Sequence, residues 1–436
     1  MTPTVGEDVW RRETPHVLAA LIRRYGDFAA CEDAVQEALI EASRQWPARG
    51  LPEKPRGWLL RVASRRLIDA RRQDTARRGR ERRAATLDQA SHTVDGEPMV
   101  EKQDASLQVL TLCCHPALTP ESQVTLALRT VLGLTTKQIA AVYLIPSSTA
   151  GQRISRAKAI IDMHHRRFPP PASQKERLPA LMHALYLTYT AGHSRAGGKQ
   201  LLDAAVTTEA IRLARLLHQE FRDETETAGL LALMLLSEAR RPARITASGD
   251  LVALREQDRT LWDQEAIAEG IDLIEKALPT GPVGAYQMQA AISAVHAEAS
   301  GWEDTDWEQI AELYAMLAQV APSPAVTMNY AVAVSEAQGP TRALGMLEPL
   351  LDDPRMNRSH RLHAVRAPLL EACGRHGEAL DAYKTASRLC TNIPEQRFFN
   401  SQITRLQADA VHAEATALTR VLLSARIHLR HTADEP

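Results

Sequence analysis

The stretch Gly133–Ile161, GLTTKQIAAVYLIPSSTAGQRISRAKAII, does most to limit what this chain can fold into. Thr135 followed by Gln138 is a capping-box pattern, which marks the start of a short helix. After a break of a few residues, a second helix restarts near Ser147 and carries several basic side chains. Two helices joined by so short a connection, the second of them basic, are typical of a helix-turn-helix.

In a helix-turn-helix the second helix enters the major groove of DNA, where Gln can read adenine and Arg can read guanine. Residues three and four apart share a face of that helix, while neighbouring basic residues suit phosphates. The same residues could also form a solvated basic helix in an ordinary bundle. The side chains that we expect to meet DNA are Ser148, Thr149, Gly151, Gln152, Arg153, Ser155, Arg156 and Lys158.

The composition favours helices throughout the chain. Aromatic residues make up only 4% of the 436 residues, whereas Ala, Leu and Arg are plentiful. At roughly 100–200 residues per domain, a chain of this length forms two to four domains with sizeable cores. We therefore expect an all-α fold.

The net charge of −1 hides an uneven distribution of charge along the chain. Residues 1–83 hold 18 Lys and Arg against 12 Asp and Glu, and residues 106–168 hold seven against two. Residues 84–105 hold one Lys and five acids, and the last 268 residues hold 26 bases and 34 acids. Two basic modules joined by an acidic link predict a polyanionic partner for the front of the chain only.

Composition also suggests where the domains begin and end. Ser, Asp, Gly and Pro dominate the link, and the prolines of Arg166–Pro179 end the helix before them. C-terminal to these prolines, the similar motifs EAQG (Glu336–Gly339) and EACG (Glu371–Gly374) lie 35 residues apart. A repeat of that length suggests stacked helical hairpins. We expect a first basic module at 1–83, a flexible acidic linker at 84–103, a second basic module at 104–168 and a helical extension at 169–436.

The first basic module contains two further motifs. In CEDAVQEALIEASRQWP, Asp33, Gln36 and Glu37 share a helix surface while their apolar neighbours turn inward. The proline-rich stretch Trp46–Trp58 then interrupts the helical pattern. The helix that follows, WLLRVASRRLIDARR, is strongly basic.

Together these motifs resemble bacterial sigma factors of the extracytoplasmic-function (ECF) group, within the sigma-70 family. LTLCCHPALTPESQVTLALRTVLGLTTKQIA, QRISRAKAII, LALMLLSEARRPAR, LREQDRTLWD and AYQMQAAISAVHAEA closely match a subgroup with a long C-terminal extension. The resemblance covers nearly the whole chain. It implies two small helical sigma domains, the second a helix-turn-helix, followed by a regulatory extension of tetratricopeptide-like helical repeats.

The resemblance also implies roles for particular residues. Asp33, Gln36 and Glu37 would dock on the clamp of core RNA polymerase, and the helix-turn-helix would read the −35 element of promoter DNA. The basic helix would hold phosphates of the −10 element. Two tryptophans flank the loop where the family captures a flipped −10 base, although both could instead be core residues. The residues expected at the −10 element are Trp46, Trp58, Arg61, Arg65, Arg66, Arg71 and Arg72.

Other classes of function have little support. The N-terminus has no secretory signal, and the longest apolar stretch, Leu230–Leu236, is too short to span a bilayer. Five cysteines without a repeated spacing indicate a reducing cytoplasm. CCHP (Cys113–Pro116) lacks a second ligand pair at zinc spacing, and no phosphate loop or nucleophile elbow is present. We expect no enzyme, no cofactor, no metal and no membrane partner.

The sequence therefore predicts a cytoplasmic sigma factor that brings core RNA polymerase to specific promoters. We expect its extension to contact the sigma domains and to modulate their activity, because tethering raises the effective concentration to roughly millimolar. The alternative is a helix-turn-helix regulator that needs no polymerase and whose helical domain senses a ligand or peptide. Such a regulator would bind duplex operator DNA alone.

Overall fold

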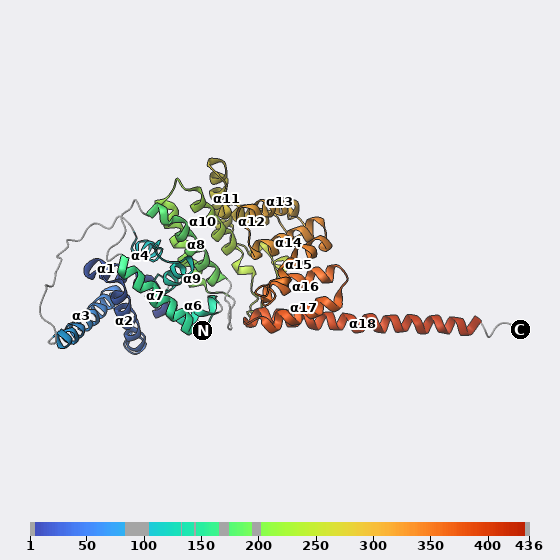
Figure 1. Cartoon of the computed structure of the whole chain (residues 1–436). Coiled ribbons are helices and arrows are strands. Elements are labelled where there is room, and N and C mark those ends of the chain that lie inside the picture. The colour runs from blue at the N-terminus through green and yellow to red at the C-terminus, as the bar shows by residue number, and fades with distance from the viewer. Residues whose placement is uncertain are drawn as a thin grey trace. The chain divides into compact units, whose positions relative to one another are not determined.

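The computed structural model describes residues 5–82, 104–131, 133–143, 145–164, 174–193 and 202–431. Within these residues every regular element is a helix, which confirms the predicted all-α fold (Figure 1). One isolated β-bridge joins Ile245 to Leu251. The chain forms two compact units: unit 1 holds residues 1–196 and 203–231, and unit 2 holds residues 197–202 and 232–436.

Unit 1 begins with the three helices of the first basic module, α1 (Val5–Tyr25), α2 (Phe28–Arg49) and α3 (Pro55–Arg82), which pack on one another. The spacing of the apolar residues explains this packing, because residues four apart share one face of a helix. The face of α3 that meets its neighbours carries the buried residues Leu59, Ala63 and Leu67.

The break between α2 and α3 is shorter than the sequence pattern predicted. The helix α2 continues through Pro47 to Arg49, and Gly50 ends it with a φ of 81°. Pro47 lies in the last turn, where the hydrogen bond that a proline removes weakens the helix without ending it. The connection is thus limited to residues 50–54.

The second basic module forms α4 (Ala105–Cys113), α5 (Pro120–Thr130), α6 (Thr136–Tyr143) and α7 (Ser147–His164). The predicted capping box is confirmed: the Thr135 N–H donates to Gln138 Oε1 at 2.8 Å, and the Gln138 N–H donates to Thr135 Oγ1 at 3.2 Å. Asp104 and Thr119 each precede a helix-forming stretch of the sequence, Thr119 with Pro120 directly after it, and their side chains cap α4 and α5. Only residues 144–146 separate α6 from α7, so the pair forms the helix-turn-helix.

The extension begins inside unit 1. Its first helices, α8 (Gln174–His193) and α9 (Ala204–Glu220), pack on each other and on α4, and α8 also packs on α5. At Gly192, near the end of α8, an added Cβ would lie 3.0 Å from the Thr207 side chain of α9. A side chain there would force the two helices apart, so the glycine permits this close approach.

Unit 2 is a stack of helices in which each packs on the next, from α11 through α18 (Figure 1). Its larger part begins within α10 (Thr225–Ala239), and short 3-10 turns follow at η2 (Arg241–Ala243), η3 (Leu254–Glu256), η4 (Arg259–Leu261) and η5 (Leu278–Thr280). The stacked helices are α11 (Gln264–Ala277), α12 (Ala285–Glu298), α13 (Trp307–Val320), α14 (Pro324–Gln338), α15 (Pro340–Asp352), α16 (His360–Ala372), α17 (His376–Leu389) and α18 (Ile393–His431).

The repeat seen in the sequence corresponds to helical hairpins. Gly339 joins α14 to α15 with a φ of 98°, and Gly374 lies between α16 and α17 with a φ of 72°. Both positions favour glycine because other residues rarely adopt a positive φ. Ala379, Tyr383 and Ala386 of α17 are buried, as expected for the second helix of a tetratricopeptide-like hairpin. The predicted helical-repeat extension is therefore confirmed in fold.

Candidate polymerase and promoter interface

The surface of α2 carries the three residues predicted to bind polymerase. Asp33 and Glu37 are exposed and Gln36 is half-buried. Asp27 fixes the start of the helix by accepting a hydrogen bond from an N–H of its first turn. The opposite face is buried and, with one exception, apolar. That exception is Glu32, which is only 1% exposed.

The basic face of α3 is only partly neutralised. Arg61, Arg65 and Arg72 are exposed and have no ion-pair partner among the described residues. Arg66 lies 3.6 Å from a carboxylate oxygen of Glu37, an exposed pair that contributes little to stability. Most of this face is therefore available to a polyanion.

Arg71 is held more firmly. Its guanidinium donates to the Tyr25 carbonyl oxygen at 2.9 Å and lies 5.0 Å from the centre of the Tyr25 ring. This contact ties the exposed face of α3 to the end of α1. Of the five arginines expected at the −10 element, Arg71 thus has the most ordered surroundings in this form.

The two tryptophans expected at the −10 element belong to one aromatic cluster. The Trp46 ring lies between those of Trp10 and Trp58, with centroid distances of 5.9 and 5.5 Å. Trp46 is 6% exposed, whereas Trp58 is half-buried. In this form Trp46 packs as a core residue, and its indole N–H is buried with no hydrogen-bond partner among the described residues.

The helix α7 presents its predicted DNA-reading residues on one side. Its buried face consists of Ala150, Ile154, Ala157 and Ile161, so the residues between them point away from the core. Ser148, Thr149, Gln152, Ser155 and Arg156 are exposed, and Gly151, Arg153 and Lys158 are half-buried.

Lys158 joins the two basic modules through a group of charged residues. Its Nζ forms ion pairs with the buried carboxylate of Glu32 and with Asp33 Oδ1, the latter at 2.7 Å. Arg129 of α5 places its Nε 3.3 Å from the other oxygen of Glu32, an ion pair without hydrogen-bond geometry. A buried carboxylate is thus compensated by two cations from the other module. We call Glu32, Asp33, Arg129 and Lys158 the charged latch.

Burial alone would lower the pKa of Lys158 because it disfavours the charged ammonium. The charges of Glu32 and Asp33 outweigh burial, so the pKa of Lys158 is raised above its ordinary value. The ammonium therefore stays charged while it is paired, as compensation of Glu32 requires.

Two further sets of hydrogen bonds join the basic modules. Asp162 of α7 accepts from the Phe28 and Ala29 N–H groups at 3.0 and 3.3 Å, which places a carboxylate at the N-terminus of α2. Such a carboxylate suits the unpaired N–H groups and the dipole of that end. In addition, Arg23 of α1 donates to Gln108 Oε1 of α4 at 2.8 Å.

The first helices of the extension make polar contacts with the second basic module. Arg177 of α8 is 4% exposed and donates to the Thr111 carbonyl oxygen of α4 at 2.9 Å. Arg212 of α9 donates to the side chains of Asp104 and Ser106 at 3.3 and 3.2 Å. Arg212 thus holds the carboxylate that caps α4.

Sequence reasoning found the exposed residues of α2, α3 and α7 but missed the contacts between them. Glu32, Arg129 and Asp162 lie in different helices, and their pairs are 97 to 134 residues apart in the chain. One signal was present, because Glu32 interrupts an apolar stripe of α2. A charge in such a position predicts a partner from another element.

Three family models match successive parts of the chain. Sigma-70 region 2 matches residues 9–77, which correspond to α1–α3. Sigma-70 region 4 matches residues 108–161, which correspond to α4–α7. A family of unknown function (DUF6596) matches residues 177–278, at the start of the extension. The order of the three matches is the order of the modules found in the sequence.

Two kinds of relative are similar to the chain. An uncharacterized protein of Rhizobium meliloti (strain 1021) is 40% identical over 400 residues, which are 91% of this chain and 94% of that protein. The probable ECF RNA polymerase sigma factor SigI of Mycobacterium tuberculosis, found in two strains, is 30% identical over 156 residues. That match covers 35% of this chain and 53% of SigI.

The matched regions coincide with the helices that carry the candidate residues. Within the part of the chain that the structure describes, each helix is too short or too polar to cross a bilayer. Sigma factor families are not enzymes. The two sigma regions, the helix-turn-helix and the similarity to SigI place this chain in the ECF group of the sigma-70 family, as a transcription-initiation factor with a long helical C-terminal extension.

Proposed function

We propose that the first basic module docks on core RNA polymerase through Asp33, Gln36 and Glu37 of α2. We further propose that the basic face of α3 binds the −10 element and that α7 reads the −35 element. Apart from Trp46, which packs in the core, these residues are exposed or half-buried on three separate helices, and this supports the assignment. The promoter contacts that we propose are Trp46, Trp58, Arg61, Arg65, Arg66, Arg71 and Arg72 at −10, and Ser148, Thr149, Gly151, Gln152, Arg153, Ser155, Arg156 and Lys158 at −35.

The arrangement of unit 1 corresponds in our proposal to a closed form of the factor. One observation carries this idea: Lys158, proposed to contact −35 DNA, is paired with Asp33, proposed to contact polymerase. The Lys158 side chain is only 13% exposed while it is paired, so in our proposal it reaches DNA after leaving Glu32 and Asp33. Binding of polymerase to α2 would therefore free Lys158 for DNA, which couples polymerase docking to promoter recognition.

The extension would act on this half of the chain by direct contact. The buried hydrogen bond of Arg177 to α4, and the contacts of Arg212 at the start of α4, support this proposal. We keep the proposed modules at 1–83, 104–168 and 169–436, and we place the protein in the cytoplasm, without a catalytic activity of its own.

The docking proposal is tested by run-off transcription with purified core polymerase on the promoter upstream of the protein's own gene. Asp33→Asn combined with Glu37→Gln should lower both transcript yield and polymerase affinity. Glu275→Gln, on α11 (Gln264–Ala277) of unit 2, is the matched control because Glu275 is an exposed carboxylate outside the proposed site. If the full chain binds duplex DNA alone and neither binds polymerase nor yields a transcript, the polymerase-independent regulator is correct.

The closed form is tested by variants that weaken the latch without removing a proposed DNA contact. Glu32→Gln should raise the affinity of the free factor for −35 duplex DNA several-fold, because Lys158 loses its buried counter-charge. Fluorophores on α2 and α7 should also move apart. Glu275→Gln again removes one exposed carboxylate and should change neither the DNA affinity nor the distance between the fluorophores. If the two variants have equal DNA affinities and equal distances between the fluorophores on α2 and α7, the closed form is contradicted.

Two C-terminal truncations of the chain test the role of the extension. A chain stopped after Phe221 keeps α8 and α9, whereas a chain stopped after Phe168 loses them. Transcription that changes only with the shorter chain would support direct contact. Arg177→Ala, with the exposed Arg222→Ala as control, examines the same contact in the full chain. Equal transcription by all these forms would exclude a modulating role for this contact.

A further inference from the structure

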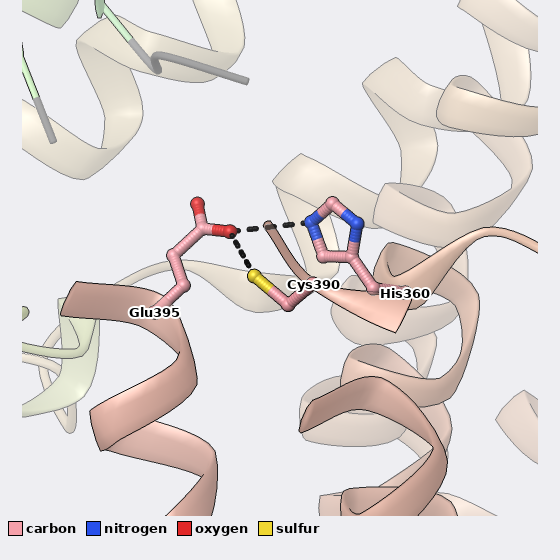
Figure 2. Close-up of side chains that lie close together, drawn as sticks. All are labelled: His360, Cys390 and Glu395. Atoms are coloured by element: carbon pink, nitrogen blue, oxygen red, sulfur yellow. Dashed lines mark hydrogen bonds and ion pairs between the residues drawn. The ribbon is translucent and has the colours of Figure 1, made fainter. Parts of the chain in front are cut away.

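Three side chains with different ligand atoms meet where three helices of unit 2 come together (Figure 2). His360 is the first residue of α16, Cys390 follows the end of α17, and Glu395 lies in the first turn of α18. His360 Nε2 lies 3.2 Å from Glu395 Oε2, and Cys390 Sγ lies 3.4 Å from the same oxygen. All three ligand atoms lie within 4.8 Å of one another.

These distances fit the edges of a small coordination sphere. Zinc binds imidazole nitrogen and carboxylate oxygen at about 2.0–2.2 Å and thiolate sulfur at about 2.3 Å. In a tetrahedron built from those bonds, the nitrogen–oxygen edge is about 3.4 Å and the sulfur–oxygen edge about 3.6 Å. The two measured separations are each about 0.2 Å shorter, so small side-chain adjustments would admit an ion.

We propose that His360, Cys390 and Glu395 form a binding site for a divalent transition metal ion of the zinc class. Nitrogen, sulfur and oxygen together suit such an ion, whereas calcium and magnesium require oxygen ligands. Three protein ligands leave a fourth position for water or an external ligand. The sequence did not reveal the site because His360 lies 30 residues before Cys390, outside the usual zinc spacings.

The site is accessible and its charges balance. Cys390 is 4% exposed, but the side chains of His360 and Glu395 are 22% and 16% exposed, so an ion can enter from solvent. Metal binding would release the thiol proton, and the resulting thiolate and carboxylate would neutralise a divalent cation. The positive charge of Arg361 acts on Cys390 and Glu395, so it would repel a cation that was bound by electrostatic attraction alone. The thiolate bond is therefore the feature that selects a thiophilic ion.

The ion would fix the geometry of the end of the stack. The contact between His360 and Glu395 and a hydrogen bond from the Cys390 thiol to Glu395 join α16, α17 and α18 at this point. Metal bonds would replace both contacts with a single centre. The start of the 39-residue helix α18 would then be anchored to both helices of the preceding hairpin.

The test uses Co²⁺ as a spectroscopic probe on the full-length chain after treatment with a chelator. We expect one equivalent of Co²⁺ to give tetrahedral d–d bands and a thiolate-to-cobalt charge-transfer band, both removed by Zn²⁺. Zinc should also raise the melting temperature of the chain. Absence of the charge-transfer band from the unmodified protein would overturn the proposal without any variant.

Variants then assign the ligands. Cys390→Ser should abolish the charge-transfer band, and His360→Gln and Glu395→Gln should each weaken Co²⁺ binding at least about tenfold. Cys373→Ser is the matched control, because Cys373 is the one half-buried cysteine of the five. Circular dichroism checks that each variant is folded. A band that persists in Cys390→Ser, or that disappears in Cys373→Ser, would show that this trio is not the site.

Discussion

The helix stack of unit 2 and the contact between α2 and α7 in unit 1 depend on different kinds of side chain. In unit 2, successive helices bury small and branched apolar residues against one another, among them Ala331, Leu347, Leu362 and Leu370. In unit 1, by contrast, α2 of the first basic module meets α7 of the second through the charged latch and the carboxylate of Asp162.

This difference shows which contacts can be exchanged. Separating the stacked helices of unit 2 would expose their buried apolar surface to water, which is unfavourable. In our proposal, outside charges replace the latch partners of its two contact residues, DNA phosphates at Lys158 and polymerase at Asp33, while Arg129 stays beside Glu32. We therefore expect unit 2 to be a stable scaffold and the latch to be a reversible contact.

The largest expected effect comes from the apolar stack. Leu370→Ala removes a fully buried side chain of α16 and should lower the free energy of unfolding of unit 2 by about 2–5 kcal/mol. Denaturant unfolding followed by circular dichroism measures this loss. Leu261→Ala, at a position that is 53% exposed, should have little effect. Similar losses for both variants would mean that the stack does not depend on its buried apolar residues.

A second effect should appear as the pH falls. Burial, together with the charges of Arg240 and Arg259, lowers the pKa of His296 to about 3. The unfolded chain, in which this pKa is near 6.5, therefore binds more protons between about pH 3 and 6.5. This contribution to stability is complete above pH 6.5 and should decline by at most about 1.4 kcal/mol per pH unit below it.

Urea unfolding of unit 2 at a series of pH values measures this decline. His296→Gln should flatten the profile between pH 6.5 and 5, because glutamine does not titrate. A variant whose profile stays parallel to that of the unmodified chain would assign the pH dependence to other groups.

A smaller effect is expected at the interface between the two modules. Asp162→Asn weakens the cap at the start of α2 and should cost about 1 kcal/mol of closed-form stability. Hydrogen exchange should then increase at the Phe28 and Ala29 amides, with unit 2 unchanged. If exchange increased equally in both units, the interface would not be a separate, reversible element.

The smallest effect should come from an exposed ion pair in unit 2. Arg375 lies 2.7 Å from Glu378, one turn away at the start of α17, and both side chains are about half exposed. Arg375→Gln should leave the unfolding midpoint unchanged, because water and salt screen such pairs. A clear drop in the midpoint would show that charge also stabilises the stack, and the contrast between the units would weaken.

Local signals in the sequence were sufficient to predict the helices and the exposed residues. The capping box of Thr135 and Gln138 and the cap at Thr119 mark helix starts through groups only three residues apart. The faces of α2 and α7 follow from apolar spacing. Pro47 misled the prediction because a proline in a last turn resembles one that ends a helix.

Contacts between distant helices could not be predicted in the same way. Apolar spacing identifies a buried face but not the helix that covers it, so the partners of Glu32 remained unknown. The trio of His360, Cys390 and Glu395 escaped for the same reason, because a helical hairpin brings its members together. The proposed polymerase and DNA contacts themselves stay predictions until the variants are measured.

The pairing of Lys158 also affects how the affinity for promoter DNA should depend on salt concentration. A lysine that moves from water to a phosphate displaces condensed counterions from DNA, and each such contact steepens the salt dependence of affinity by about 0.9 in logarithmic slope. In the proposed binding mode, Lys158 would leave two carboxylates when it reaches DNA, and those carboxylates would then attract cations from solution. Cations released at the promoter would be partly taken up at α2, so the salt dependence of promoter affinity would be shallower than the basic residues alone would give.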